Sequence, residues 1–263
     1  MDKSLLLKFR QLDVTPTGLY EVTGFHDVDV AVANFIADIV DRARICEPNE
    51  FNRAFANFTD RPKSDKVIVG RWDTPQQLLR HIAMAQAGRI SEKNDDYRNK
   101  DYLPLVNLSR NFMVSIGNTD RAIQSRNKDH TLIYNGMQAK RNVIAVCASQ
   151  PATLTYDLFV LGPDKESTSL LCNALGLQLV EMVNTGFEAH TRLATSSLKL
   201  DCALDSVKGF MLSDLTPEPD TEKYYCATTQ LTVITEAVIA YNVMAVNSTV
   251  NLFNAQISDK CQK

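Results

Sequence analysis

The fold is decided by the stretch QPATLTYDLFVL at residues 150–161. Apolar residues alternate with threonine and aspartate along it, so a β-strand here has one apolar face and one polar face. Gly162-Pro163 ends the strand, and Asp164 can cap a helix whose apolar residues recur at helical spacing as far as Val183. The apolar stripe of that helix must lie on the apolar face of the strand. The stretch therefore predicts a folding unit in which strand and helix share one core.

The composition is that of a globular protein with a genuine core. The 263 residues are 44% hydrophobic and carry 28 basic and 31 acidic side chains, a formal charge of −3. This weak negative charge argues against binding nucleic acid through the phosphate backbone, although it leaves room for a local basic patch. The apolar runs are far shorter than the roughly 20 residues of a membrane span, and Ser4-Leu5-Leu6-Leu7 is too short for the core of a signal peptide. We therefore expect a protein that is made and used in a cytoplasm, without a membrane partner.

Residues 1–88 are predicted to form an arm followed by a mainly helical region. The arm spans about residues 1–26, with turn chemistry at Thr15-Pro16-Thr17-Gly18. Helices are predicted at about residues 27–45, through the phenylalanines of residues 51–58, and at about residues 74–87, where Thr-Pro-Gln-Gln is a capping-box signature. Residues 89–102 are nearly all polar and are predicted to form a linker or exposed loop.

Residues 103–241 are predicted to form an α+β core, and residues 242–263 a final strand or arm. Strands are predicted at about residues 105–116, 141–147, 150–161, 192–204, 207–212 and 224–241. Together with the helix after Asp164, they give the order strands, helix, strands. That order favours an antiparallel β-sheet with helices packed on one face. The fold class we expect is α+β, with a mainly helical N-terminal region and extended termini.

Residues that could carry chemistry are scattered along the chain. The four histidines lie far apart, and the sequence has no glycine-rich phosphate loop, no His-Glu-x-x-His motif and no nucleophile elbow, so we expect no catalytic residues, cofactor or metal. The six cysteines form no Cys-x-x-Cys pair and are expected to be reduced and mostly buried. Cys202 and Cys226 lie in two predicted strands and could face each other. The residues alone indicate a protein that recognises other proteins.

The second half of the chain resembles a known family in the order of its elements. Tyr102-Leu103-Pro104-Leu105-Val106-Asn107-Leu108 is followed by a polar excursion and then by residues 151–160, PATLTYDLFV. A helix after Asp164-Lys165-Glu166, the strand SLKLDCAL at residues 197–204 and the strand ATTQLTV at residues 227–233 complete the order. This order is similar to that of the tail terminator, or sheath-stabilising, proteins of T4-like contractile-tailed bacteriophages. The resemblance covers about residues 102–241, and the first 90 residues match less well.

The resemblance implies a structural virion protein. Such a protein forms a ring, typically a homohexamer, that caps the viral tail tube and the sheath and joins the contractile tail to the neck. Its partners would be copies of itself and the tube, sheath and neck proteins, with DNA passing through the channel. The ring would be assembled in the host cytoplasm and would reside in the tail and neck of the virion.

Two polar segments are the candidate interface by position. Residues 117–135 form a polar excursion that is long for a hairpin tip, and residues 213–223 form a second polar loop. We expect them to reach neighbouring subunits, the tube or DNA, although a merely solvated loop is an equal alternative. The candidate interface residues are Arg121, Arg126, Lys128, Asp214, Glu218 and Glu222.

Three other functions remain open on the sequence. The protein could be another ring of the phage neck or connector, or a non-viral adaptor. It could also be a cytosolic enzyme with an unrecognised site that uses a thiol such as Cys147 or Cys172. An enzyme of this kind should hold at least one reactive thiol in a pocket.

Overall fold

The computed structural model describes residues 4–72, 74, 77–78, 81, 103–117, 131–134, 143–194, 196–215 and 224–256. Its strands are β1 (Ser4–Val22), β2 (Val67–Val69), β3 (Leu105–Ile116), β4 (Thr131–Tyr134), β5 (Val143–Gly162), β6 (Gly186–Leu193), β7 (Ser196–Val207), β8 (Met211–Leu215) and β9 (Tyr224–Gln256). Its helices are α1 (His26–Arg42), α2 (Arg53–Thr59), α4 (Lys165–Glu181) and the 3₁₀ turn η1 (Lys63–Asp65).

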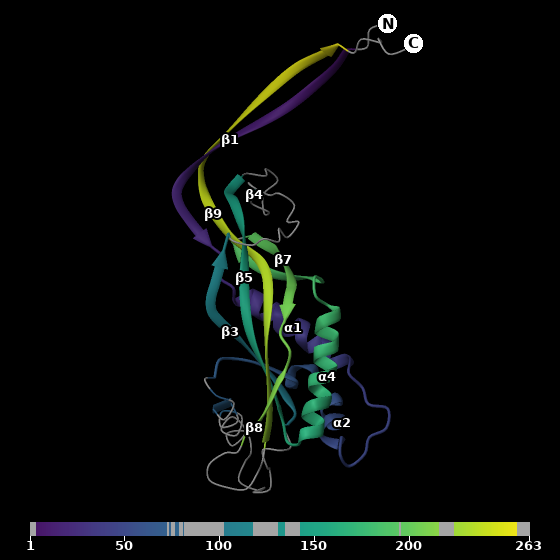
Figure 1. Cartoon of the computed structure of the whole chain (residues 1–263). Coiled ribbons are helices and arrows are strands. Elements are labelled where there is room, and N and C mark those ends of the chain that lie inside the picture. The colour runs from purple at the N-terminus through teal and green to yellow at the C-terminus, as the bar shows by residue number, and fades with distance from the viewer. Residues whose placement is uncertain are drawn as a thin grey trace, which may run out of the picture.

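One sheet holds all nine described strands, and the chain is α+β as the sequence predicts (Figure 1). The main strand order is β2-β3-β5-β9-β7-β6, with β1 and β8 also paired to β9, and β4 paired to β5. Every pair is antiparallel except the short parallel pair of β2 and β3, so the sheet is mixed rather than purely antiparallel. The long strands β5 and β9 run side by side through its centre.

The main core lies between one face of the sheet and the helices. Leu154, Tyr156, Leu158 and Val160 of β5 are all fully buried, which confirms the predicted alternation. They join Leu171, Leu175 and Leu179 of α4 and the buried residues of α1 and α2 in one apolar cluster. A smaller cluster on the opposite face gathers Leu103, Leu105, Leu161 and Cys226 at the end of the sheet where β8 lies. The helices therefore cover one face of the body of the sheet, and the smaller cluster covers one end of the other face.

The two long helices are anchored by local polar contacts. The carboxylate of Asp164 accepts a hydrogen bond of 2.7 Å from the backbone N–H of Ser167, which confirms the predicted cap of α4. At the end of α1, the Arg44 guanidinium donates to the carbonyls of Asp41 and Ala43, which the helix itself leaves without partners. The chain after α2 is tied to α1 by the buried ammonium of Lys66, which lies 2.6 Å from the Asp41 carboxylate. These contacts fix both helices at their ends.

The predicted strands at residues 141–147 and 150–161 are one strand, β5, that passes through Pro151. One edge of β5 pairs with β4 as far as Cys147 and with β3 from Ala152 onward. Pro151 lies between these two partners, where its missing N–H removes no bond to either strand, and its carbonyl accepts from the N–H of Gly117. A proline is therefore tolerated inside this strand.

The predicted strand at residues 192–204 is confirmed for residues 196–204, which belong to β7, but the chain forms a hairpin at its start. β6 pairs with β7 without a register shift, from Gly186 opposite Ala203 to Leu193 opposite Ser196. The turn begins at Ala194, whose φ of +48° lies in the left-handed region that tight hairpin turns require. Alanine rarely adopts that conformation, so the sequence carries no glycine or asparagine signal for this turn.

The structure does not support the prediction of a mainly helical N-terminal region. Ser4–Val22 is a long strand, and although α1 and α2 follow near the predicted positions, β2 then joins the main sheet. The predicted turn at Thr15-Pro16-Thr17-Gly18 is an irregularity inside β1, where the register with β9 shifts on both sides of Pro16 and Gly18 has a φ of +85°. The predicted linker at residues 89–102 and most of the helix at residues 74–87 lie outside the described residues. In the described part of that helix, the N–H of Gln77 donates to the hydroxyl of Thr74, which is the hydrogen bond expected of a capping threonine.

Candidate assembly surfaces

The N-terminal and C-terminal strands leave the sheet together as a two-stranded arm (Figure 1). From Ser4 opposite Gln256 to Thr15 opposite Ala245, β1 and β9 pair in a single register. The pairing of β9 with β5 stops at Asn242, and from Val243 to Gln256 β9 pairs with β1 and with no other described strand. At about 3.3 Å per residue this arm extends roughly 40 Å from the body. We call residues 4–15 and 245–256 the terminal arm.

An isolated two-stranded ribbon is only marginally stable in water. Within the described residues, each strand of the terminal arm has one edge that pairs with no other strand, and unpaired edges readily accept a further strand. The sequence also places leucine or phenylalanine at alternate positions 5, 7 and 9 of β1, opposite Ala255, Phe253 and Asn251 of β9. An arm with open edges and apolar residues at alternate positions is suited to bind another chain.

Apolar side chains also gather on β3, beyond the short stretch that pairs with the edge strand β2. The register of β3 with β5 shifts between Arg110 and Val114, so that β3 bulges there. Phe112 and Met113 in the bulge are 81% and 80% exposed, and the guanidinium of Arg71 lies 4.0 Å from the centre of the Phe112 ring. Aromatic residues, methionine and arginine are the residues that protein interfaces prefer. We call Arg71, Phe112 and Met113 the β3 bulge surface.

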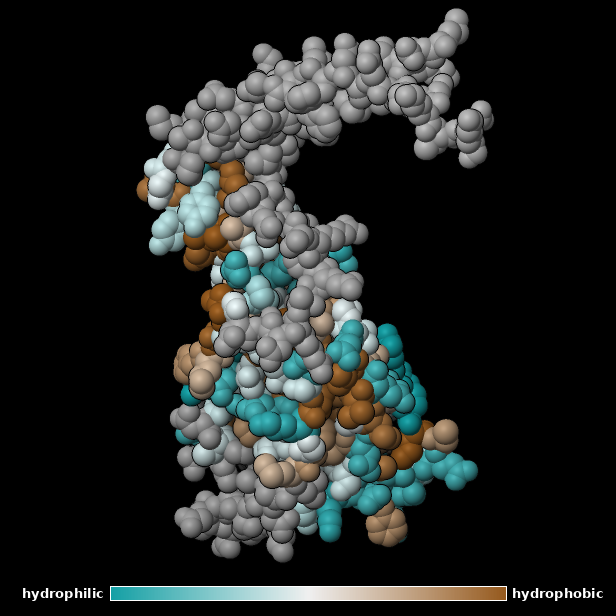
Figure 2. Space-filling model, turned by 45° about the horizontal axis from the view of Figure 1, so that its top comes forward, coloured by the Kyte–Doolittle hydropathy of each residue, from teal (hydrophilic) through white to brown (hydrophobic). Residues whose placement is uncertain are grey.

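A second exposed apolar group lies at the base of the terminal arm. Leu19, Tyr20 and Val22 of β1 are all more than half exposed, and the Tyr20 ring lies 6.2 Å from that of Tyr241 on β9. β1 pairs with β9, whereas β3 pairs with β5, so the two central strands separate this group from the β3 bulge surface. Figure 2 likewise shows several separate brown, apolar areas on one face of the molecule. The chain thus exposes two different apolar groups at two different places on the sheet.

The helices contribute an apolar groove of their own. A groove of about 300 Å³ runs between α1 and α4 and is lined mainly by Ile39, Val40, Leu175 and Leu177. Leu177 is 69% exposed, and the neighbouring turn of α4 exposes Val180 as well. This groove has few polar groups to fix a small ligand, so it is better suited to an apolar side chain of a protein partner.

The cysteines and other potential metal ligands among the described residues bear on whether the chain could use a metal or a thiol in catalysis. No group of three or more histidine, cysteine, aspartate or glutamate residues that could hold a metal is found among them. Burial raises the pKa of the Cys172 thiol to about 12 and that of Cys226 to about 12, and it also raises the pKa of Cys147. A catalytic thiol has a lowered pKa and an accessible sulfur, so these thiols have the opposite character.

Cys202 and Cys226, which could have faced each other on the sequence alone, do not do so. Neither cysteine forms a disulfide, and they belong to the two apolar clusters on opposite faces of the sheet. Neighbouring strands bring residues together only when their side chains point to the same face, which the sequence alone does not show for these two positions.

The predicted interface residues are not tested by the described structure. Arg121, Arg126, Lys128, Glu218 and Glu222 lie outside the described residues, and Asp214 lies in β8, where it pairs with Tyr225. The sequence analysis missed the β3 bulge surface, because a bulge breaks the alternation that marks the buried positions of a strand. It also missed the pairing of the two chain ends, although both were predicted to be arms. The only signal for that pairing was the apolar character of both ends.

The comparisons with known proteins add no relative. No family model matches the chain, and no curated protein matches it. The likeness to phage tail terminators stays a prediction from the sequence. Within the part of the chain that the structure describes, no helix has the length and apolar character needed to cross a membrane.

Proposed function

We propose that the chain is a structural virion protein that forms a ring, caps the tail tube and sheath of a contractile-tailed phage, and joins the tail to the neck. The observation that supports this most is the terminal arm. A two-stranded ribbon with open edges needs a partner to be stable, and a protein that works in an assembly supplies one. The resemblance of residues 102–241 to tail terminators is the reason for proposing a ring of the phage tail as this assembly.

The exposed apolar groups are compatible with a ring. A closed ring of identical subunits uses a heterologous interface, in which one surface of each copy binds a different surface of the next copy. The β3 bulge surface and the group of Leu19, Tyr20 and Val22 are two such surfaces, separated by β5 and β9. An isologous dimer would need only one self-complementary patch.

Another ring of the phage neck or connector is the nearest alternative, because it would need the same arm and the same pair of surfaces. An enzyme that uses a thiol is less well supported, since burial raises the pKa of Cys147 and Cys172. A non-viral adaptor would bind its partners as a single copy, so its behaviour at high concentration distinguishes it from both rings.

Negative-stain imaging of the purified full-length chain tests the proposal. We expect closed rings of uniform diameter. We also expect that Phe112→Ser together with Met113→Ser abolishes them, whereas Met211→Ser, at an exposed methionine of β8, leaves them intact. Particles of single-subunit size at every concentration would contradict the proposal.

A further inference from the structure

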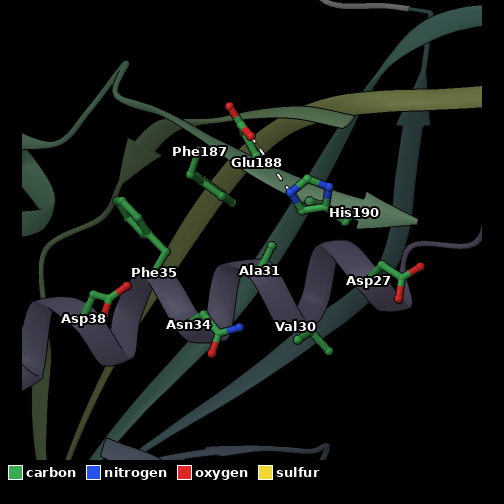
Figure 3. A pocket seen from close by; sticks show the side chains of 10 residues that line it. Asp27, Val30, Ala31, Asn34, Phe35, Asp38, Phe187, Glu188 and His190 are labelled. Carbon is green, nitrogen blue, oxygen red and sulfur yellow. Dashed lines mark ion pairs between the residues drawn. The ribbon is translucent and has the colours of Figure 1, made fainter. Parts of the chain in front are cut away.

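A groove runs along the open edge of β6, between this strand and α1 (Figure 3). It measures about 350 Å³ and lies between one side of α1 and β6. Its apolar wall comprises Val30, Ala31, Phe35 and Phe187, and Figure 3 shows the rings of Phe35 and Phe187 close together, with centres 4.8 Å apart. Val30 is 44% exposed at the groove, so the wall is only partly covered by the chain itself.

The rim of this groove is acidic. Asp27 and Asp38 on α1 and Glu188 on β6 all line it, together with His190, which lies 4.0 Å from Glu188 (Figure 3). Asp38 pairs with Lys63 and Glu188 pairs with Lys199, but both pairs are exposed. Exposed ion pairs contribute less than about 1 kcal/mol and can be exchanged for new ones. The groove therefore suits a segment that is both apolar and basic.

The backbone of β6 is able to accept an additional strand. β6 is the last strand of the main sheet order, and among the described strands it pairs only with β7. Its eight residues carry no register shift, so its free edge is regular over about 26 Å. The free edge of β3 is interrupted by a bulge, and bulges hinder pairing with a further strand. β6 is thus the longer regular edge, and the groove lies along it.

The terminal arm has the composition that this groove requires. In β1, Leu5, Leu7 and Phe9 occupy one set of alternate positions, while Lys8 and Arg10 occupy the other set. A strand of this kind, added to the edge of β6, would direct one set of positions toward α1 and the other set away from it. The apolar set matches the wall formed by Phe35 and Phe187, and the basic set would lie on the face of β6 that carries the exposed carboxylate of Glu188. The arm points away from the helices of its own copy, so a second copy must supply it (Figure 1).

We propose that the terminal arm of one copy adds as a strand to the free edge of β6 in the next copy and fills the groove between α1 and β6. This inference rests on the proposed ring and names the contact that would link its subunits. The partner is a second copy of this chain, and the contact combines strand addition with burial of apolar side chains. It joins two different surfaces, as a ring requires.

Photo-crosslinking of the full-length chain tests this contact. Phe9 is replaced by benzoylphenylalanine, which keeps an aromatic ring at that position, and the protein is mixed with isotopically heavy copies so that links between copies can be recognised by mass. We expect position 9 to be linked to residues 27–38 or 186–193 of another copy.

A pair of matched variants makes the test specific. Asn34 lines the groove on α1, and Asn173 is an asparagine of the same exposure class on α4, away from the groove. Asn34→Arg places a bulky charged side chain where the apolar residues of the arm must bind, so we expect the yield of links between copies to fall at least about tenfold, whereas Asn173→Arg should leave it unchanged.

The other outcomes separate this contact from the ring itself. Links from position 9 to a different region of another copy, or equal losses for both arginine variants, would overturn the docking of the arm on β6 and leave the proposed ring standing. Links only within one copy, from a protein that stays a single subunit, would overturn both.

Discussion

The hydroxyl of Tyr156, in the middle of β5, donates a hydrogen bond of 2.8 Å to the carboxylate of Asp29 on α1. The same carboxylate oxygen lies 3.0 Å from the Nε of Arg110 on β3, the residue that pairs with Tyr156 across the two strands. One carboxylate thus holds the first turns of α1 against two neighbouring strands. Because α1 forms one wall of the groove along β6, this network also helps to position that groove.

Removing the hydroxyl of Tyr156 should destabilise the protein. Tyr156→Phe leaves the mostly buried carboxylate of Asp29 without one of its two partners, and we expect the free energy of unfolding to fall by about 1–3 kcal/mol. Urea denaturation measures this. Tyr20→Phe, at a tyrosine that is 62% exposed, is the control and should change stability by less than about 0.5 kcal/mol. Equal effects of the two substitutions would show that the hydrogen bond contributes nothing.

The contribution of Asp29 to stability should depend on pH. Burial raises the pKa of Asp29 above its ordinary value of 3.8, although the Tyr156 hydroxyl and Arg110 act in the opposite direction. The folded state then takes up a proton more readily than the unfolded state, so this contribution is fully present below 3.8 and is lost as the pH rises through the raised pKa. We expect Asp29→Asn to cost more stability at about pH 4 than at about pH 7. A larger cost at the higher pH would contradict this sign.

Gly162 at the end of β5 should not tolerate a side chain. A Cβ there would lie 2.0 Å from the hydroxyl oxygen of Thr168, which itself donates to the carbonyl of Asp164 at the start of α4. We expect Gly162→Ala to lower the free energy of unfolding by about 1–3 kcal/mol. Gly24→Ala is the control, because a Cβ at Gly24 meets no atom within 4 Å. Adding Thr168→Ala to Gly162→Ala should recover part of the loss, and strict additivity of the two costs would argue against the clash.

The thiols should differ sharply in their reaction with an alkylating or disulfide reagent. In a Cys261→Ser background, we expect only Cys46 to react quickly at neutral pH, since it is exposed and the other described cysteines are buried. Burial also raises the pKa of Cys202 to about 11, so almost no thiolate is present at neutral pH. Rapid modification of Cys147 or Cys172 in the folded protein would revive the thiol-enzyme alternative.

The parts of the fold that were predictable from the sequence are those with a strong local pattern. The alternation in residues 150–161, the cap at Asp164 and the apolar stripe of α4 depend on residues within a few positions of each other. The sequence therefore shows the strand and helix at the centre of the fold. It also shows the apolar character of both chain ends, without showing that they pair.

The remaining features depend on contacts between distant residues. The pairing of Ser4 with Gln256 joins the two ends of the chain, and no local pattern reports it. The hairpin of β6 and β7 turns at Ala194, a residue that gives no turn signal. Because this hairpin was not predicted, β6 was not recognised as a strand with a free edge. Exposure of Phe112 depends on a bulge whose position is fixed by the register with β5. The candidate assembly surfaces could therefore not be predicted from the sequence, because they depend on which strand edges are left unpaired and on the register between strands.

Native mass spectrometry of the full-length chain over a range of concentrations tests the ring most directly. A closed ring has one fixed stoichiometry, and six copies of the 29.4 kDa chain give a mass of about 176 kDa. We predict a single dominant species of fixed copy number, near that mass for a hexamer, which is lost when the terminal arm or the β3 bulge surface is altered. A chain that remains at 29.4 kDa at every concentration, or that forms open series of every size, would contradict the account.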